Sequence, residues 1–160
     1  MTEVRLEPWT ADDRELLERS NTPEMTRFLG GPESAAKLAV RHLRYLDNTF
    51  TGQMLVIVRP DGTRAGSIGF WEHGDVWETG WSVLPDHQGR GIASAALTAL
   101  VPVVAAHGGH PSLHAYPRVD NVASNALCRR AGWTLDGEIA FEYPKGNPIT
   151  CHDWYVITNR

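Results

Sequence analysis

The sequence predicts one mixed α/β (α+β) domain over residues 1–160, with a twisted, mostly antiparallel sheet flanked by helices. The order of apolar patterns carries this prediction: one strand, two helices and three strands precede a helix, a strand, a helix and two final strands. Turn signals such as Asp61-Gly62 join consecutive strands directly, as in antiparallel hairpins. An apolar fraction of 42% and a charged fraction of 21% fit a folded globule.

In the first half of the chain, turn and cap residues mark the ends of the expected elements. Thr10 and Asp13 resemble a capping box that opens the first helix. Thr22-Pro23 interrupts that helix, and Gly30-Gly31-Pro32 separates it from the next one. We expect a strand at 4–9, a helix from 10, a short helical piece at 25–29, a helix at 35–46 and strands at 54–58, 65–71 and 76–84.

The second half begins with a long helix that is apolar on most faces and is therefore expected to pack against the sheet. Pro102 is expected to kink this helix, and Gly132 to end the next one. We expect helices at 91–106 and 121–131, and strands at 113–116, 133–143 and 151–158.

Composition narrows the class of protein. A net charge of −4 argues against a nucleic-acid partner, which calls for a basic surplus. Two cysteines in a chain of this length do not form a disulfide framework. No secretory signal pattern is visible at the start, and the longest apolar stretch, 93–106, is short for a membrane span of about 20 residues. We therefore expect a cytoplasmic protein without a membrane partner.

The turn at 85–94 is the most informative stretch, because a strand ends, glycines follow and a long helix starts. Gly89 and Gly91 let the backbone approach a ligand, the helix N-terminus favours an anion, and Arg90 suits phosphate oxygens. An ordinary strand-to-helix turn remains an alternative. A dinucleotide fingerprint matches only two of its three glycines, since Ser94 stands at the third position.

At two places the sequence resembles the GNAT family of N-acetyltransferases. Gln88-Gly89-Arg90-Gly91-Ile92-Ala93 is similar to the family's acyl-CoA pyrophosphate loop. Residues 121–133 are similar to its Asn-x-x-Ser/Ala-x-x-Leu-Tyr-x-x-x-Gly-Phe helix, with Cys128 where many members have Tyr. Glu78-Thr79-Gly80-Trp81 matches a pattern of the branch that contains the ribosomal-protein N-terminal acetyltransferases.

This resemblance implies acetyl-CoA as cosubstrate, held where strands four and five splay apart with the help of a local bulge. Arg90, Arg118, Arg129 and Arg130 give residues 85–133 a local charge of +2, although Arg129 and Arg130 can equally form a solvated helix face. Asn121 and Ser124 can alternatively cap their helix. The implied CoA-binding residues are Trp81, Ser82, Val83, Gln88, Gly89, Arg90, Gly91, Ile92, Ala93, Ser94, Asn121 and Ser124.

Acetyl transfer to an amine requires a base, donors for the oxyanion and, for the leaving thiolate, an acid. Glu78 and Glu142 are the candidate bases, and a main-chain N–H near Val83 is the candidate oxyanion donor. Ser124 and Cys128 are the candidate acids, with Tyr116 as a third, although Cys128 can also be a buried hydrophobe.

By resemblance, the acceptor amine lies between residues 25–32 and 141–149, which are apolar and carry few acids. We expect a small amine metabolite or a peptide N-terminus rather than an aminoglycoside. A non-catalytic acyl-CoA binder of the same fold is the competing hypothesis. The resemblance also suggests a homodimer. We expect no metal, because His107, His110 and His114 span a helix end, a loop and a strand.

Overall fold

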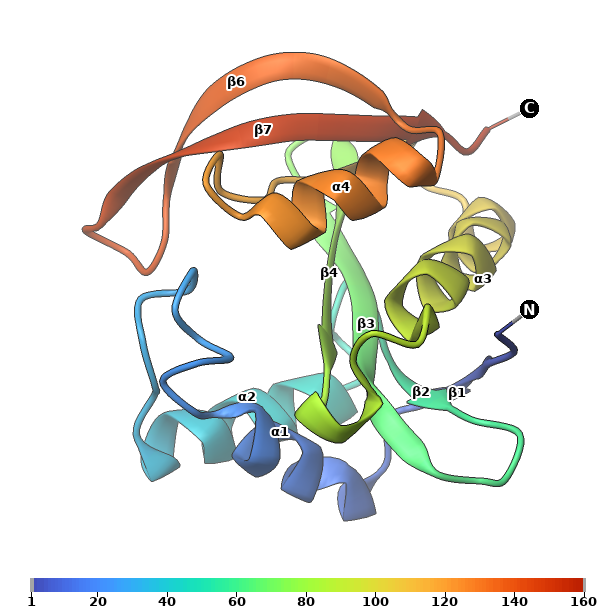
Figure 1. The fold of residues 1–160 in the computed structure, drawn as a ribbon, viewed down its shortest axis with the longest axis vertical. Coiled ribbons are helices and arrows are strands. Elements are labelled where there is room, and N and C mark those ends of the chain that lie inside the picture. The colour runs from blue at the N-terminus through green and yellow to red at the C-terminus, as the bar shows by residue number, and fades with distance from the viewer. Residues whose placement is uncertain (1, 160) are drawn as a thin grey trace.

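The computed structural model describes residues 2–159, in which seven strands form one sheet with helices on both faces (Figure 1). The spatial order is β1-β2-β3-β4-β5-β7-β6, and only β4 and β5 pair in parallel. The strands are β1 (Arg5–Pro8), β2 (Gly52–Val58), β3 (Arg64–His73), β4 (Val76–Val83), β5 (Ser112–Ala115), β6 (Thr134–Glu142) and β7 (Pro148–Ile157). The helices are η1 (Ala11–Asp13), α1 (Arg14–Ser20), α2 (Ala35–Leu46), η2 (Pro85–His87), α3 (Ile92–His107) and α4 (Val122–Arg130). The predicted fold class and order of elements are confirmed.

The N-terminal segment contains the predicted capping box and one correction. Asp13 accepts from the Thr10 backbone at 2.8 Å, and its buried carboxylate also receives two hydrogen bonds from Arg64, at 2.7 and 2.8 Å. The short helical piece expected at 25–29 is wrong, because residues 23–30 form consecutive turns. Pro23 removes one backbone donor, and Gly30 takes a φ of +90°, which a right-handed helix does not contain.

The sheet is buried on both faces because β2 is apolar at successive positions. Leu55 and Ile57 join the larger core cluster, which α3 and α4 cover, whereas Met54 and Val56 join a second cluster with residues of α1 and α2. Helix α3 continues through Pro102, which is exposed, from Ile92 to His107. None of the helices within residues 2–159 is long and apolar enough to cross a bilayer.

The sheet opens between β4 and β5. These strands pair only from Trp77↔Leu113 to Thr79↔Ala115, so the last residues of β4 have no partner on β5. The pairing of β3 with β4 is continuous from His73↔Val76 to Gly66↔Val83 without a register shift. The prediction of a bulge in β4 is therefore wrong. The strands separate because β5 ends after Ala115, while β4 continues along β3.

Candidate active site

Two residues of β4 direct main-chain groups into the opening beside β5. Alternate residues of an antiparallel strand point their N–H and C=O groups to opposite sides. The Val83 carbonyl accepts from Gln88 Nε2 at 2.9 Å, on the side away from β3. By the same alternation, the main-chain groups of Trp81 also face the opening. The Val83 carbonyl is thus already bonded to Gln88, whereas the main-chain groups of Trp81 can pair with an extended ligand that takes the place of a missing strand.

The glycine turn after β4 ends at the N-terminus of α3, beside the same opening (Figure 1). Gly91 is the N-cap residue, with a φ of +76° and no side-chain cap, and Gly89 has a φ of +75°. The first N–H groups of a helix lack intrahelical acceptors, and here no cap side chain uses them. Together with the helix dipole, they fit the diphosphate of a coenzyme A ligand. Thr2 donates its hydroxyl to the Arg90 carbonyl at 2.5 Å and so ties the turn to the N-terminal segment.

Glu78 lies one residue before the point where β4 and β5 separate. Its side chain is only 16% exposed, and burial raises the pKa of its carboxyl to about 7. His73 Nδ1 is 3.3 Å from Glu78 Oε1, and the β3 partner of Glu78 is Trp71. A carboxyl with a pKa close to neutral can accept a proton and release it again at pH 7.

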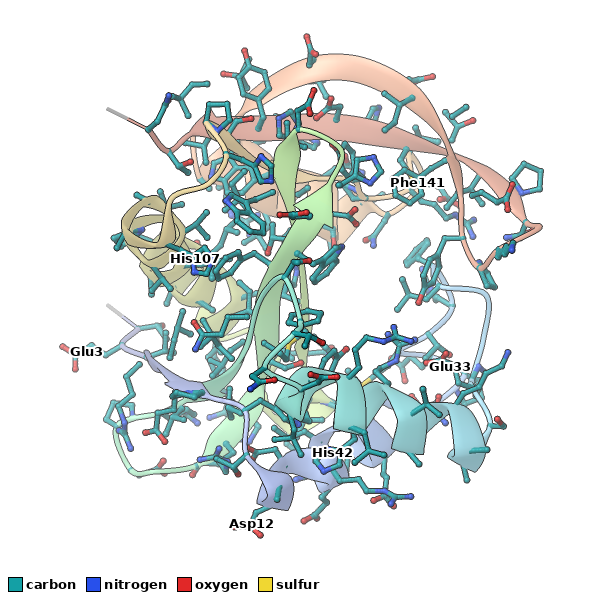
Figure 2. The ribbon with its side chains drawn as sticks, turned by 180° about the vertical axis from the view of Figure 1, so that it is seen from behind. Glu3, Asp12, Glu33, His42, His107 and Phe141 are labelled. Atoms are coloured by element: carbon teal, nitrogen blue, oxygen red, sulfur yellow. The ribbon has the colours of Figure 1, made fainter. Side chains whose placement is uncertain are left out.

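Aromatic rings surround this carboxyl on the side of β6. His73 stacks on Phe141 with a centroid distance of 5.5 Å and an interplanar angle of 16°, and Tyr116 packs on both, at 5.2 and 5.4 Å. Figure 2 shows Phe141 beside the tip of the β3–β4 hairpin. Burial, Asp153 and Glu78 all raise the pKa of the Tyr116 hydroxyl. The cluster is therefore an aromatic wall beside the Glu78 carboxyl, and it includes one imidazole.

His114 forms a separate closed hydrogen-bonded chain on β5. Its Nδ1 is 2.6 Å from Asp153 Oδ1, and its Nε2 is 2.9 Å from Ser112 Oγ. The ring packs between Tyr116 and Tyr155. Both nitrogens are thus occupied, and no three His, Cys, Asp or Glu side chains among residues 2–159 gather as metal ligands.

The acetyltransferase (GNAT) domain model matches residues 3–134. The chain belongs to the GNAT acetyltransferase family. No curated protein sequence matches it.

Three solved structures share the GNAT fold with this chain. An acetyl transferase from Salmonella typhimurium that modifies the N-terminal serine of 50S ribosomal subunit protein L7/L12 has a TM-score of 0.81 at 23% identity, over 98% of this chain and 96% of that one. An acetyltransferase from Agrobacterium tumefaciens has a TM-score of 0.77 at 26% identity, over 98% and 92%. The spermidine N-acetyltransferase of Vibrio cholerae, in complex with CoA and spermine, has a TM-score of 0.80 at 14% identity, over 97% and 95%.

The other candidate base of this GNAT chain, Glu142, lies at the tip of the β6–β7 hairpin. Its exposed carboxylate accepts from the Gly146 N–H at 2.6 Å and thereby stabilises the turn. Glu78, by contrast, is confined beside the opening between β4 and β5. The two carboxylates that the sequence left as alternatives therefore differ in the structure, because only Glu78 is confined beside the opening.

Three residues that share one face of α4 have different environments in the structure. Asn121 caps the helix, because its Oδ1 accepts from the Ser124 N–H at 3.2 Å. Ser124 is half-buried, whereas Cys128 is fully buried in the larger core cluster. Burial raises the pKa of the Cys128 thiol to about 12. Such a thiol is a far weaker acid than an ordinary thiol of pKa about 8.5.

The α1–α2 loop and the β6–β7 hairpin meet where Gly30 lies against Pro144. A Cβ on Gly30 would be 2.5 Å from the Pro144 ring, so this close approach requires glycine. Two reciprocal hydrogen bonds of 2.8 Å between Asn21 and the Glu33 backbone fix both ends of the loop. The Glu33 carboxylate in turn receives hydrogen bonds from Arg41, the shortest at 2.7 Å. Figure 2 labels Glu33 at the start of α2.

Sequence reasoning missed the residues that position this site. The sequence patterns do not single out His73, although its place between the predicted strand at 65–71 and the Gly74-Asp75 turn marks the hairpin tip. Arg118 and Arg27 both place their guanidinium groups over Phe28, at 5.4 and 4.7 Å. Arg118 is also paired with Asp120 at 2.6 Å, and Arg129 lies over Trp154 at 5.4 Å. Two of the four arginines of residues 85–133, Arg118 and Arg129, thus have partners within the protein.

Proposed function

We propose that this protein transfers an acetyl group from acetyl-CoA to a primary amine by direct attack in a ternary complex. The observation that carries the proposal is Glu78, a confined carboxyl with a pKa of about 7 beside the opening of the sheet. Membership of the GNAT family supports the reaction class. The complexes of related folds with coenzyme A support the cosubstrate.

In this proposal the CoA diphosphate binds the N–H groups of residues 88–94, and the pantetheine arm extends along β4. Among the β4 residues whose N–H faces the opening, Trp81 is the first one beyond the point where β4 and β5 separate. We therefore assign the Trp81 N–H, rather than that of Val83, to the acetyl oxygen. Preorganised N–H donors of this kind stabilise a developing oxyanion. Glu78 accepts a proton from the amine, and the nitrogen attacks the acetyl carbon.

The leaving thiolate needs at most a hydrogen-bond donor. We assign this role to Ser124, which is half-buried on the face of α4 that also carries Asn121. Cys128 is an unsuitable acid, because protonating a thiolate of ordinary pKa from a thiol of pKa about 12 is unfavourable by about 5 kcal/mol. We therefore treat Cys128 as a core residue, and we leave Glu142 out of the chemistry because its carboxylate is committed to its own turn.

The acceptor is an α-amine of a peptide or an amine metabolite. The supporting observation is the aromatic wall of His73, Tyr116 and Phe141 beside the Glu78 carboxyl, which suits one cationic amine on a compact apolar group. Related folds acetylate the N-terminal serine of a ribosomal protein or act on spermidine, so acceptors of both sizes occur in this architecture.

Acetyl-CoA consumption with a panel of amines tests the proposal, with Glu78→Gln and Glu142→Gln as a matched pair. We expect Glu78→Gln to lower kcat by about 10²- to 10⁴-fold and Glu142→Gln to change it less than about threefold. The non-catalytic alternative predicts that acetyl-CoA raises the melting temperature but that no amine is consumed. If acetyl-CoA neither binds nor raises the melting temperature, both hypotheses are wrong.

A further inference from the structure

The carboxyl of Glu78 needs a route by which its proton reaches water after each turnover. Its side chain is 16% exposed, whereas that of His73 is 45% exposed, so the imidazole bridges the confined carboxyl and solvent. The two atoms that face each other are Glu78 Oε1 and His73 Nδ1, at 3.3 Å. This separation permits direct proton transfer after a small side-chain movement.

Packing against neighbouring rings fixes the orientation of the His73 imidazole. Phe141 stacks on one side of the ring, and Tyr116 packs against it at 5.2 Å. In this orientation Nδ1 faces the Glu78 carboxyl, while 45% of the His73 side chain remains exposed. His114 cannot replace it, because Asp153 and Ser112 occupy both of its nitrogens.

We propose that His73 is a positioning residue that takes the proton from Glu78 and releases it to solvent. This inference rests on the proposed function. The ammonium of the acceptor gives one proton to the Glu78 carboxylate, and the neutral amine attacks the acetyl carbon. As the C–S bond breaks, the second nitrogen proton leaves with the thiolate as the free thiol of coenzyme A. The protonated Oε1 then gives that proton to His73 Nδ1, and the imidazolium releases a proton from Nε2 to water or buffer. This leaves the carboxylate and a neutral imidazole with its proton on Nδ1, and proton exchange with water returns the ring to the Nε2–H tautomer before the next turnover.

Several titratable groups face this pair and belong to its electrostatic environment. Tyr116 follows β5, and Cys151 and Asp153 come from β7. Burial raises the pKa of both Tyr116 and Cys151, and the nearby Glu78 charge raises it further. Desolvation sets the raised pKa of Glu78, and an imidazolium at His73 would oppose it by stabilising the carboxylate. Proton transfer between the two groups therefore changes the charge next to each of them.

The kinetic test compares His73→Asn and His73→Phe with the wild type and with His110→Asn. His110 is a matched control because its Nε2 is 3.4 Å from the carboxylate of Glu72, in a His–carboxylate pair away from Glu78. We expect both His73 variants to lower kcat by about tenfold or more, to change the KM for acetyl-CoA less than about twofold and to recover activity with added imidazole. A kcat within twofold of the wild type from pH 6 to 9, or a loss that imidazole does not restore, overturns the relay.

A second measurement does not depend on turnover. Carbon NMR of the Glu78 carboxyl should show that His73→Asn raises the pKa of Glu78 by about 0.5 or more, because the imidazolium is lost. An unchanged pKa contradicts the coupling and overturns the relay, whatever the activity. If the wild type acetylates no amine although this coupling is present, the proposed function fails and the coupled pair itself stands.

Discussion

Trp154 on β7 donates its indole N–H to the side-chain oxygen of Asn125 on α4 at 2.9 Å, inside the protein. The same oxygen also lies 2.7 Å from His152 Nδ1, and the Asn125 amide nitrogen donates to the carbonyls of Arg118 and Asn121. One buried amide therefore joins α4, β7 and the segment before the helix. The indole is only a donor, which requires the amide oxygen on that side.

Replacing Asn125 by Leu should lower the free energy of unfolding by about 2–4 kcal/mol. The substitution puts a bulkier apolar side chain in place of the amide and leaves the Trp154 and His152 groups without their partner. The Arg118 and Asn121 carbonyls lose the side-chain donor and keep only their backbone hydrogen bonds. Denaturant unfolding followed by tryptophan fluorescence measures the change. Asn147→Leu is the control, because that exposed amide makes one hydrogen bond, to the Tyr143 carbonyl. Equal losses in the two variants would contradict the central role of Asn125.

Glu78→Gln should stabilise the protein at neutral and alkaline pH. The pKa of Glu78 is about 7 in the folded protein, compared with its ordinary value of 4.5. Between these two pH values the folded state therefore binds more protons than the unfolded state. The wild type therefore loses stability as pH rises from about 4.5 to 7, by up to about 3 kcal/mol. Melting curves from pH 4 to 9 should diverge from those of the variant across this window. The exposed Glu142→Gln variant should follow the wild type; parallel curves for Glu78→Gln would refute the assignment.

Gly91→Ala should weaken acetyl-CoA binding roughly tenfold, which corresponds to about 1.4 kcal/mol. Alanine at a φ of +76° is strained, and its Cβ would lie 3.2 Å from the Thr2 hydroxyl, so the turn must shift at the helix N-terminus. Calorimetric titration with acetyl-CoA measures the loss. Gly62→Ala is matched to it, with a φ of +90° in the β2–β3 turn and open space around its Cβ. A similar loss of affinity in both variants would show a global effect.

Cys128→Ala should cost about 1–2 kcal/mol of stability while kcat changes less than about threefold. The thiol fills space in the core, and its loss leaves a small cavity without removing a catalytic group. Ser124→Ala should show the opposite pattern, with a lower kcat and little change in the melting temperature. A hundredfold loss of kcat in a fully folded Cys128→Ala protein would instead show that the thiol takes part in catalysis.

Local patterns predicted most of the fold. The apolar run at 54–58, the capping box at Thr10 and the turn at Gly74-Asp75 are encoded within a few residues, and each is present as expected. The helical piece at 25–29 failed because apolar spacing there competes with Pro23 and Gly30, whose backbone restrictions dominate over so short a segment. The bulge in β4 failed because an opening in a sheet can also arise where the neighbouring strand ends.

By itself, the sequence determined the glycine turn before α3, the order of the elements and the resemblance that implies acetyl-CoA as cosubstrate. Only the tertiary structure decided between Glu78 and Glu142, buried Cys128 and brought His73 to the carboxyl. Burial depends on which strands and helices pack around a residue, and the free energy of a charge depends on that burial. Neither quantity is encoded in the spacing of residues along the chain.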